Sequence, residues 1–200
     1  MKKNFILSML AIVFYFGFIY ISCNTLGDEN EGYVIGDTGP SGGIVFYDKG
    51  RITNGWRYLE AAPQDLEGSY KWASSGKETT ALIHVQGAVI GTGKRNTNDI
   101  LEYDTNAPAA KACVDYNLNG YNDWFLPSKD ELNLMLTNLV ALGCYFNTTG
   151  DDSSWYWSST DSNSEDNNGR KQVWSQNFGS TYQDRIWKER NQLVRPVRAF

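Results

Sequence analysis

The residues of this sequence with the clearest chemical potential are carboxylates in two polar loops of its last third. Five acidic side chains form this group: Asp151, Asp152, Asp161, Glu165 and Asp166. Carboxylate oxygens, with the neighbouring amides of Asn167 and Asn168, are ligands that calcium takes in proteins. The loops lack EF-hand spacing, and exposed turns are rich in Asp and Asn for other reasons. Two interpretations therefore stand, a calcium site and loops without an ion. Calcium is the only cofactor that the sequence suggests.

Aromatic side chains offer a second kind of chemistry, the stacking of sugar rings on exposed Trp and Tyr. The candidates for such a surface are Trp72, Trp155, Tyr156, Tyr182 and Trp187. Alternation along a strand would place Trp155 and Trp157 on one face and Tyr156 on the other. Packing in the core is the alternative for each ring, and for Trp124 and Trp157 we expect the core.

Catalytic residues find little support in the sequence. His84 is the only histidine, and we expect it to be structural. A Ser-His-Asp triad and a histidine-ligated zinc site therefore lack their residues. A glycosidase needs two carboxylates at a defined separation across a cleft, and no motif singles out such a pair. We predict that the protein is not an enzyme.

The first 22 residues predict an export signal. Lys2 and Lys3 precede an almost wholly apolar run that ends at Ile21, and Cys23 follows in a context typical of a lipobox. We therefore expect lipidation of Cys23 and export to a bacterial membrane, most simply the outer membrane, on its surface or periplasmic side. A retained transmembrane anchor and an ordinary secretory signal are the alternatives.

The rest of the chain divides into a tether and a single domain. Residues 23–32 are polar and acidic, which is typical of a flexible tether. Residues 33–200 suffice for one domain with a substantial core. The chain carries a net charge of −5 at pH 7. Because phosphate binding needs a basic surface, this charge argues against nucleic acid as a partner. We expect contact with the membrane through the lipid anchor only.

Two cysteines lie within the predicted domain, Cys113 and Cys144. In an oxidising compartment, such a pair favours a disulfide. The alternative is that both are small buried side chains.

The elements that must position these residues are organised around residues 119–132. This segment opens with an Asn-Gly turn signal and continues with aromatic residues as far as Pro127. Ser128 and Glu131 then have the spacing of a capping box. They predict the start of an amphipathic helix over 129–142.

Shorter patterns predict the remaining elements. Helices are expected over 97–104 and 106–118, and strands over 44–47, 56–61, 155–160, 173–178 and 193–200. Strands thus precede and follow two or three helices. This order is typical of an α+β fold with antiparallel sheets, built from distant parts of the chain and connected by long loops.

Several of these motifs are similar to those of a known family. They are residues 119–128, Trp157-Ser158-Ser159-Thr160 and residues 194–200, together with residues 36–47 and 90–97. Over about residues 33–200, the sequence resembles the Lcl C-terminal domain family, named for a Legionella collagen-like adhesin. The resemblance implies a C-type-lectin-like architecture, in which the N- and C-terminal strands pair and a long loop region carries binding.

The resemblance also implies an adhesin-like function. The named adhesin binds sulfated polysaccharides through basic surfaces, and the negative charge of this chain departs from that pattern. We therefore predict a non-catalytic surface lipoprotein domain that binds an extracellular or envelope ligand, either glycan or protein. The alternatives are a structural or assembly module of the envelope and a carbohydrate-active hydrolase.

Overall fold

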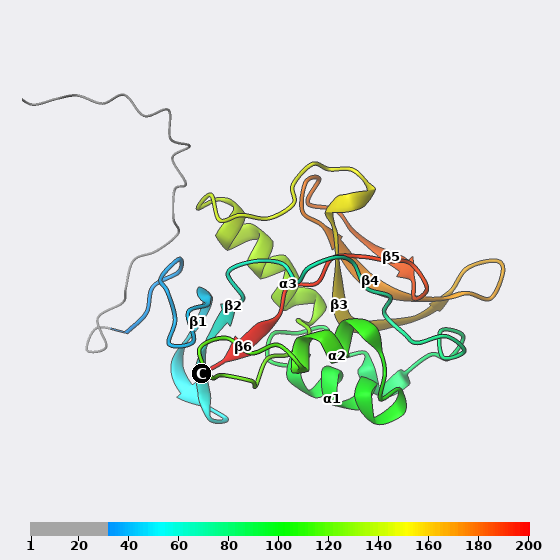
Figure 1. Cartoon of the computed structure of the whole chain (residues 1–200), viewed down its shortest axis with the longest axis horizontal. Helices are drawn as coiled ribbons and strands as arrows, with labels where there is room; N and C mark the ends of the chain where they lie inside the picture. The colour runs from blue at the N-terminus through cyan, green and yellow to red at the C-terminus, as the bar shows by residue number, and fades with distance from the viewer. Residues whose placement is uncertain (1–31) are drawn as a thin grey trace, which may run out of the picture.

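Two three-stranded antiparallel sheets form the framework of the molecule, which a computed structural model describes over residues 32–200. The first sheet has the order β1 (Ile44–Thr53), β2 (Trp56–Ala61), β6 (Val197–Ala199). The second has the order β3 (Trp155–Glu165), β4 (Lys171–Asn177), β5 (Gln183–Trp187). Figure 1 shows the first described residues, β1 and the C-terminus at one end of the molecule and β5 at the other.

Three α-helices connect the two sheets. They are α1 (Gly93–Tyr103), α2 (Pro108–Val114) and α3 (Lys129–Met135), which continues as a π-helical turn over Leu136–Val140. Single 3₁₀ turns lie at Ile83–Val85 and Asp152–Ser154. The predicted α+β class is therefore confirmed, whereas the C-type-lectin-like architecture stays a prediction.

The predicted signal peptide, the lipidation site Cys23 and residues 23–31 of the tether lie outside the described residues. Within residues 32–200, no helix is long and apolar enough to span a bilayer.

The helix boundaries differ from the predicted ones where tertiary contacts decide them. The first helix begins at Gly93 rather than at residue 97, and the Thr97 hydroxyl donates to the Gly93 carbonyl within its first turn. The second ends at Val114 rather than at residue 118. It stops there because Leu118 and Tyr121 exchange backbone hydrogen bonds of 3.1 and 3.0 Å in a tight turn.

The strands also differ from the prediction, chiefly in the second sheet. The second of the two predicted polar loops, which carries Asp161 and Asp166, is largely a hairpin, in which β3 continues to Glu165 and pairs there with Lys171 of β4. The edge strand β5 was not predicted. Side chains form hydrogen bonds with the backbone of Arg185 in β5. The Asp184 carboxylate accepts from the Arg185 N–H, and the Gln172 side chain donates to the Arg185 carbonyl. Such an edge is poorly suited to pairing with another chain.

The core consists of two clusters of buried side chains. One packs the first sheet against α3, and its members include Phe46, Leu59, Leu132, Met135 and Tyr156. The other lies between the second sheet and helices α1 and α2, and its members include Trp72, Ile100, Cys113, Trp157 and Val194. The predicted core positions of Trp124 and Trp157 are confirmed.

The buried carboxylate of Glu60 joins the N-terminal loop to the last strand. It accepts hydrogen bonds from the Gly43 N–H at 3.1 Å and from the Arg198 guanidinium at 2.9 Å, and Arg198 also pairs with Asp123. A Cβ atom at Gly39 or Gly43 would lie within 3 Å of the Glu60 carboxylate. Glycine at these two positions therefore allows the N-terminal loop to lie against the Glu60 carboxylate.

The predicted capping box is confirmed at the start of α3. The Ser128 side chain accepts from the Glu131 N–H, and the Glu131 carboxylate accepts from the Ser128 N–H at 2.7 Å. The same carboxylate accepts from the Gly91 N–H at 2.7 Å, which fixes the loop before α1. Burial raises the pKa of Glu131 to about 7, although the backbone N–H groups of Ser128, Gly91 and Gly93 lower it.

This raised pKa predicts a pH-dependent stability. The folded state binds the Glu131 proton more tightly than the unfolded state does. The stabilisation is therefore complete below the ordinary carboxyl pKa and is lost as the pH rises through about 7. We expect the free energy of unfolding to fall by about 1–3 kcal/mol between pH 5 and pH 8. Urea denaturation across this range measures the fall.

Glu131→Gln should flatten this pH profile, because glutamine does not titrate. The matched control is Glu102→Gln, which changes an exposed glutamate of α1 and should leave the profile unchanged. Equal profiles for the parent protein and Glu131→Gln would contradict the assignment.

Candidate functional site

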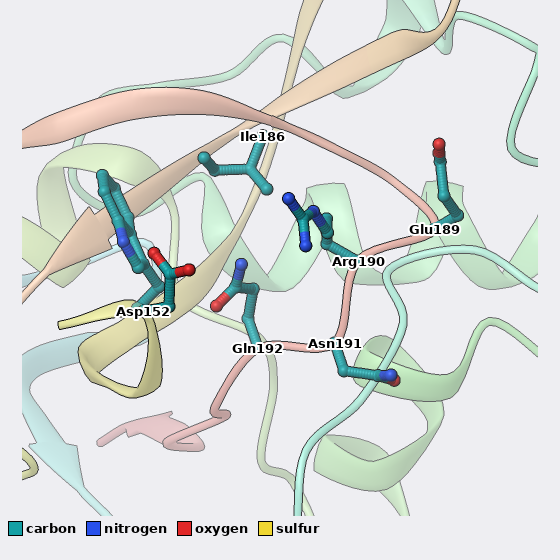
Figure 2. A pocket seen from close by; sticks show the side chains of 7 residues that line it. Asp152, Ile186, Glu189, Arg190, Asn191 and Gln192 are labelled. Atoms are coloured by element: carbon teal, nitrogen blue, oxygen red, sulfur yellow. The ribbon is translucent and has the colours of Figure 1, made fainter.

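A small pocket opens at the β5 end of the molecule. Its cavity volume is about 280 Å³, and it is lined by Asp152, Trp155, Ile186, Glu189, Arg190, Asn191 and Gln192. Figure 2 shows the side chains of Asp152, Arg190 and Gln192 pointing toward a common space, whereas Glu189 and Asn191 point away from it. The pocket thus combines two apolar side chains with an anion, a cation and an amide.

Two of the five predicted ligand-binding aromatics, Trp155 and Tyr182, lie at one end of the second sheet, and a third, Trp187, lies at the other end of β5. Trp155 lines the pocket, and the exposed ring of Tyr182 meets it edge to face with centroids 6.4 Å apart. Trp187 is half-buried, and the guanidinium of Arg190 lies 5.2 Å from its ring centroid. The structure therefore brings Trp155 and Tyr182 into contact, whereas Trp187 is connected to the pocket only through Arg190.

The other two predicted aromatics are buried, so their assignment to an exposed surface was wrong. The Trp72 indole donates to the Ser158 carbonyl at 2.9 Å inside the second core cluster. The Tyr156 hydroxyl donates to Asp65 at 2.8 Å, and its ring packs on Phe178. Tyr156 follows Trp155 in β3 and so faces the opposite side of the sheet, against the first core cluster.

A buried ion pair fixes the turn that carries most of the pocket residues. The Lys188 ammonium is inaccessible and donates to Asp161 at 2.7 Å and to the Thr80 carbonyl at 2.6 Å. Burial lowers the pKa of Lys188, and the charge of Asp161 opposes this. Gln192, at the far end of the turn, exchanges backbone hydrogen bonds with Tyr70. The turn is therefore held at both ends before any ligand arrives.

The predicted calcium ligands each have a local role instead of forming a cluster. Asp151 accepts from the Ser153 N–H at the start of a 3₁₀ turn, and Asp161 pairs with Lys188. Glu165 and Asp166 pair with Lys171 and Arg170 across the hairpin. Asp152 alone lines the pocket. Residues 32–200 contain no group of three His, Cys, Asp or Glu side chains placed to hold a metal ion. Calcium binding by these loops stays a prediction.

The predicted disulfide between Cys113 and Cys144 is not formed, because Cys113 is a free thiol. Cys113 lies fully buried in the second core cluster, and burial raises its pKa well above the usual value. Its role is that of a small core side chain.

Five pocket residues were missed by sequence reasoning: Ile186, Glu189, Arg190, Asn191 and Gln192. They look like an ordinary charged turn after a strand. Their place beside Trp155 depends on the buried Lys188 and on the Tyr70–Gln192 pairing, both of which join distant segments. The charged run beside Trp187 was the one local signal.

Two wider cavities lie elsewhere, and residues of α1 line both of them. One, of about 430 Å³, has a floor that includes Trp56 and Phe125. The other, of about 440 Å³, includes the exposed His84. The two share Arg95 and Asp99. None of the predicted ligand-binding aromatics lines either cavity, so the pocket at Trp155 is the stronger candidate.

Removal of the buried cation should destabilise the fold. Lys188→Met leaves the Asp161 carboxylate buried without its partner, which typically costs about 3–5 kcal/mol. Urea denaturation measures the loss. Adding Asp161→Asn should restore part of it, because the orphaned charge is then removed. The control is Lys171→Met at the exposed pair with Glu165, where we expect a loss below about 1 kcal/mol. Similar losses in both single variants would contradict this account.

Comparison with known proteins identifies the chain. A family model described as the Lcl C-terminal domain matches residues 62–198, which is more than half of the 200 residues. No curated protein matches the chain. The matched region contains helices α1 to α3, the whole second sheet and the pocket residues. This chain therefore belongs to the Lcl C-terminal domain family.

Proposed function

We propose that this chain is an exported, adhesin-like domain that binds a glycan without catalysis, through the pocket at Trp155. Membership of the Lcl C-terminal domain family supports the adhesin-like role. The observation that carries the proposal is the composition of the pocket. A partly exposed indole lies beside a carboxylate, a guanidinium and an amide in a cavity of about 280 Å³.

Each component suits a sugar. The flat indole offers an apolar surface for one face of a pyranose ring, and Ile186 extends that surface. Asp152 accepts hydrogen bonds, Arg190 donates them, and Gln192 does both, so hydroxyl groups find partners of either kind. The volume lies near the lower end of the range for small-ligand pockets, roughly 300–1,000 Å³. A single sugar residue of a longer chain fits this size.

The arrangement favours binding over hydrolysis. A glycosidase needs two carboxylates that face each other across the sugar. The pocket has two carboxylates in its lining, but Glu189 points away from Asp152 (Figure 2).

The proposal includes the membrane anchor. The apolar run before Cys23 supports export and lipidation, and residues 24–32 would then join the lipid to the domain. Strand β5, whose Ile186 lines the pocket, lies at the end of the molecule opposite to the first described residues (Figure 1). A tether attached there would leave the pocket facing away from the membrane.

Replacement of Trp155 should weaken glycan binding. We expect Trp155→Ala to reduce binding on a glycan array at least about ten-fold, since the loss of one stacking surface is worth about 1.4 kcal/mol or more. The matched control is Trp174→Ala, which removes another half-buried tryptophan of the second sheet, outside the pocket and next to Lys129. The array is read with calcium and again with chelator.

Equal binding by the two variants would exclude the pocket as the site. A parent protein that binds no glycan in either condition would contradict glycan binding and favour a protein ligand. Binding that disappears with chelator would place the site in the calcium-candidate loops of Asp151 and Asp166 instead of the pocket.

Replacement of Cys23 should release the protein from the membrane. In cells given a radiolabelled fatty acid, the parent chain should incorporate label and Cys23→Ser should not, because the serine hydroxyl cannot form the thioether. Cys113→Ser is the control and should retain the label. Labelled Cys23→Ser protein would contradict lipidation at this residue.

A further inference from the structure

Arg190 reaches the pocket without a carboxylate partner. Five other arginines of residues 32–200 form ion pairs: Arg57, Arg95, Arg170, Arg195 and Arg198. Arg190 forms none within those residues, although the protein as a whole is acidic. Figure 2 shows its guanidinium pointing toward the pocket, whereas the carboxylate of the adjacent Glu189 points away. The guanidinium is therefore available to an anion that enters the pocket.

The guanidinium is also held in place. The Arg190 N–H donates to the Trp187 carbonyl at 3.0 Å, and the side chain lies over the Trp187 ring with 5.2 Å between the guanidinium carbon and the ring centroid. The preceding Lys188 is buried and ion-paired. A cation that is already oriented loses little conformational freedom on binding. Less of the favourable free energy of its interaction with an anion is therefore offset.

The other charges of the pocket limit what kind of anion can bind. The lining contains one guanidinium and two carboxylates, those of Asp152 and Glu189. A ligand with several negative charges would be repelled by the Asp152 carboxylate, which faces the pocket, whereas a ligand with one charge placed at Arg190 would not. Asp152 and Gln192 then face the uncharged part of the ligand, where they can pair with hydroxyl or amide groups (Figure 2).

We infer that the pocket selects a sugar residue with a single carboxylate, of the uronic acid class. Arg190 binds the carboxylate, Asp152 and Gln192 bind the hydroxyl groups, and one face of the ring packs on Trp155. This inference rests on the proposed function, since it names the class of sugar that the same pocket takes. A planar guanidinium can bind a planar carboxylate through two parallel hydrogen bonds, which a neutral hydroxymethyl group cannot form.

Matched methyl glycosides test the inference. Binding of the protein to the glucuronoside, galacturonoside and mannuronoside is measured by isothermal titration calorimetry and compared with the corresponding neutral glycosides and their 6-sulfates. We expect at least one uronoside to bind ten-fold or more tightly than its neutral partner, and more tightly than its 6-sulfate. In Arg190→Gln this ratio should fall to near one, with weak binding of the neutral glycoside retained. Arg185→Gln, which changes another unpaired arginine outside the pocket lining, should keep the ratio.

The outcomes separate the inference from the proposed function. Neutral glycosides that bind as tightly as the uronosides, or a ratio unchanged in Arg190→Gln, would overturn the inference and leave glycan binding intact. Tighter binding of the 6-sulfates would overturn it in favour of a general anion site. If no glycoside binds, the inference fails, and a blank glycan array would show that the proposed function fails with it.

Discussion

Burying a cation costs several kcal/mol unless carboxylates and carbonyls replace the water that it loses. The fold depends on three buried cations in its last segment, each of which has such partners. Lys188, Arg195 and Arg198 are all buried. Lys188 binds Asp161 and the Thr80 carbonyl. Arg195 binds Asp65 and the carbonyls of Ala62 and Tyr145, and Arg198 binds Glu60 and Asp123. Each cation thus gathers groups from distant parts of the chain around one point.

These three residues explain how so many irregular loops can be ordered. The segment that carries them runs from the second sheet to the first, where β6 pairs with β2 (Figure 1). The loops that it crosses contribute side-chain carboxylates or main-chain carbonyls rather than long apolar stretches. Apolar packing supplies the two core clusters, and the buried cations determine which loop lies where. The candidate pocket is a product of this arrangement, because its turn follows directly from Lys188.

Local signals in the sequence were sufficient where a few neighbouring residues decide the structure. The capping box at Ser128 depends only on adjacent residues, and it was predicted correctly. The exposure of an aromatic ring, in contrast, depends on residues that are distant in the sequence. Tyr156 and Trp155 are neighbours in one strand, yet one is buried and the other lines a pocket, because different parts of the chain cover the two faces of the sheet. Asp161 could not be separated from the calcium candidates, since its partner Lys188 lies far along the chain.

The first described residues and strand β5, whose Ile186 lines the pocket, lie at opposite ends of the molecule (Figure 1), which has a mechanical consequence. If the chain is held at its N-terminal side and a ligand is pulled from the pocket, the load must pass from the second sheet to the first. One route runs along the segment that ends in β6, through Arg195 and Arg198. Breaking that route would require separating buried opposite charges and peeling β6 from β2. The same contacts that order the loops would therefore resist that load.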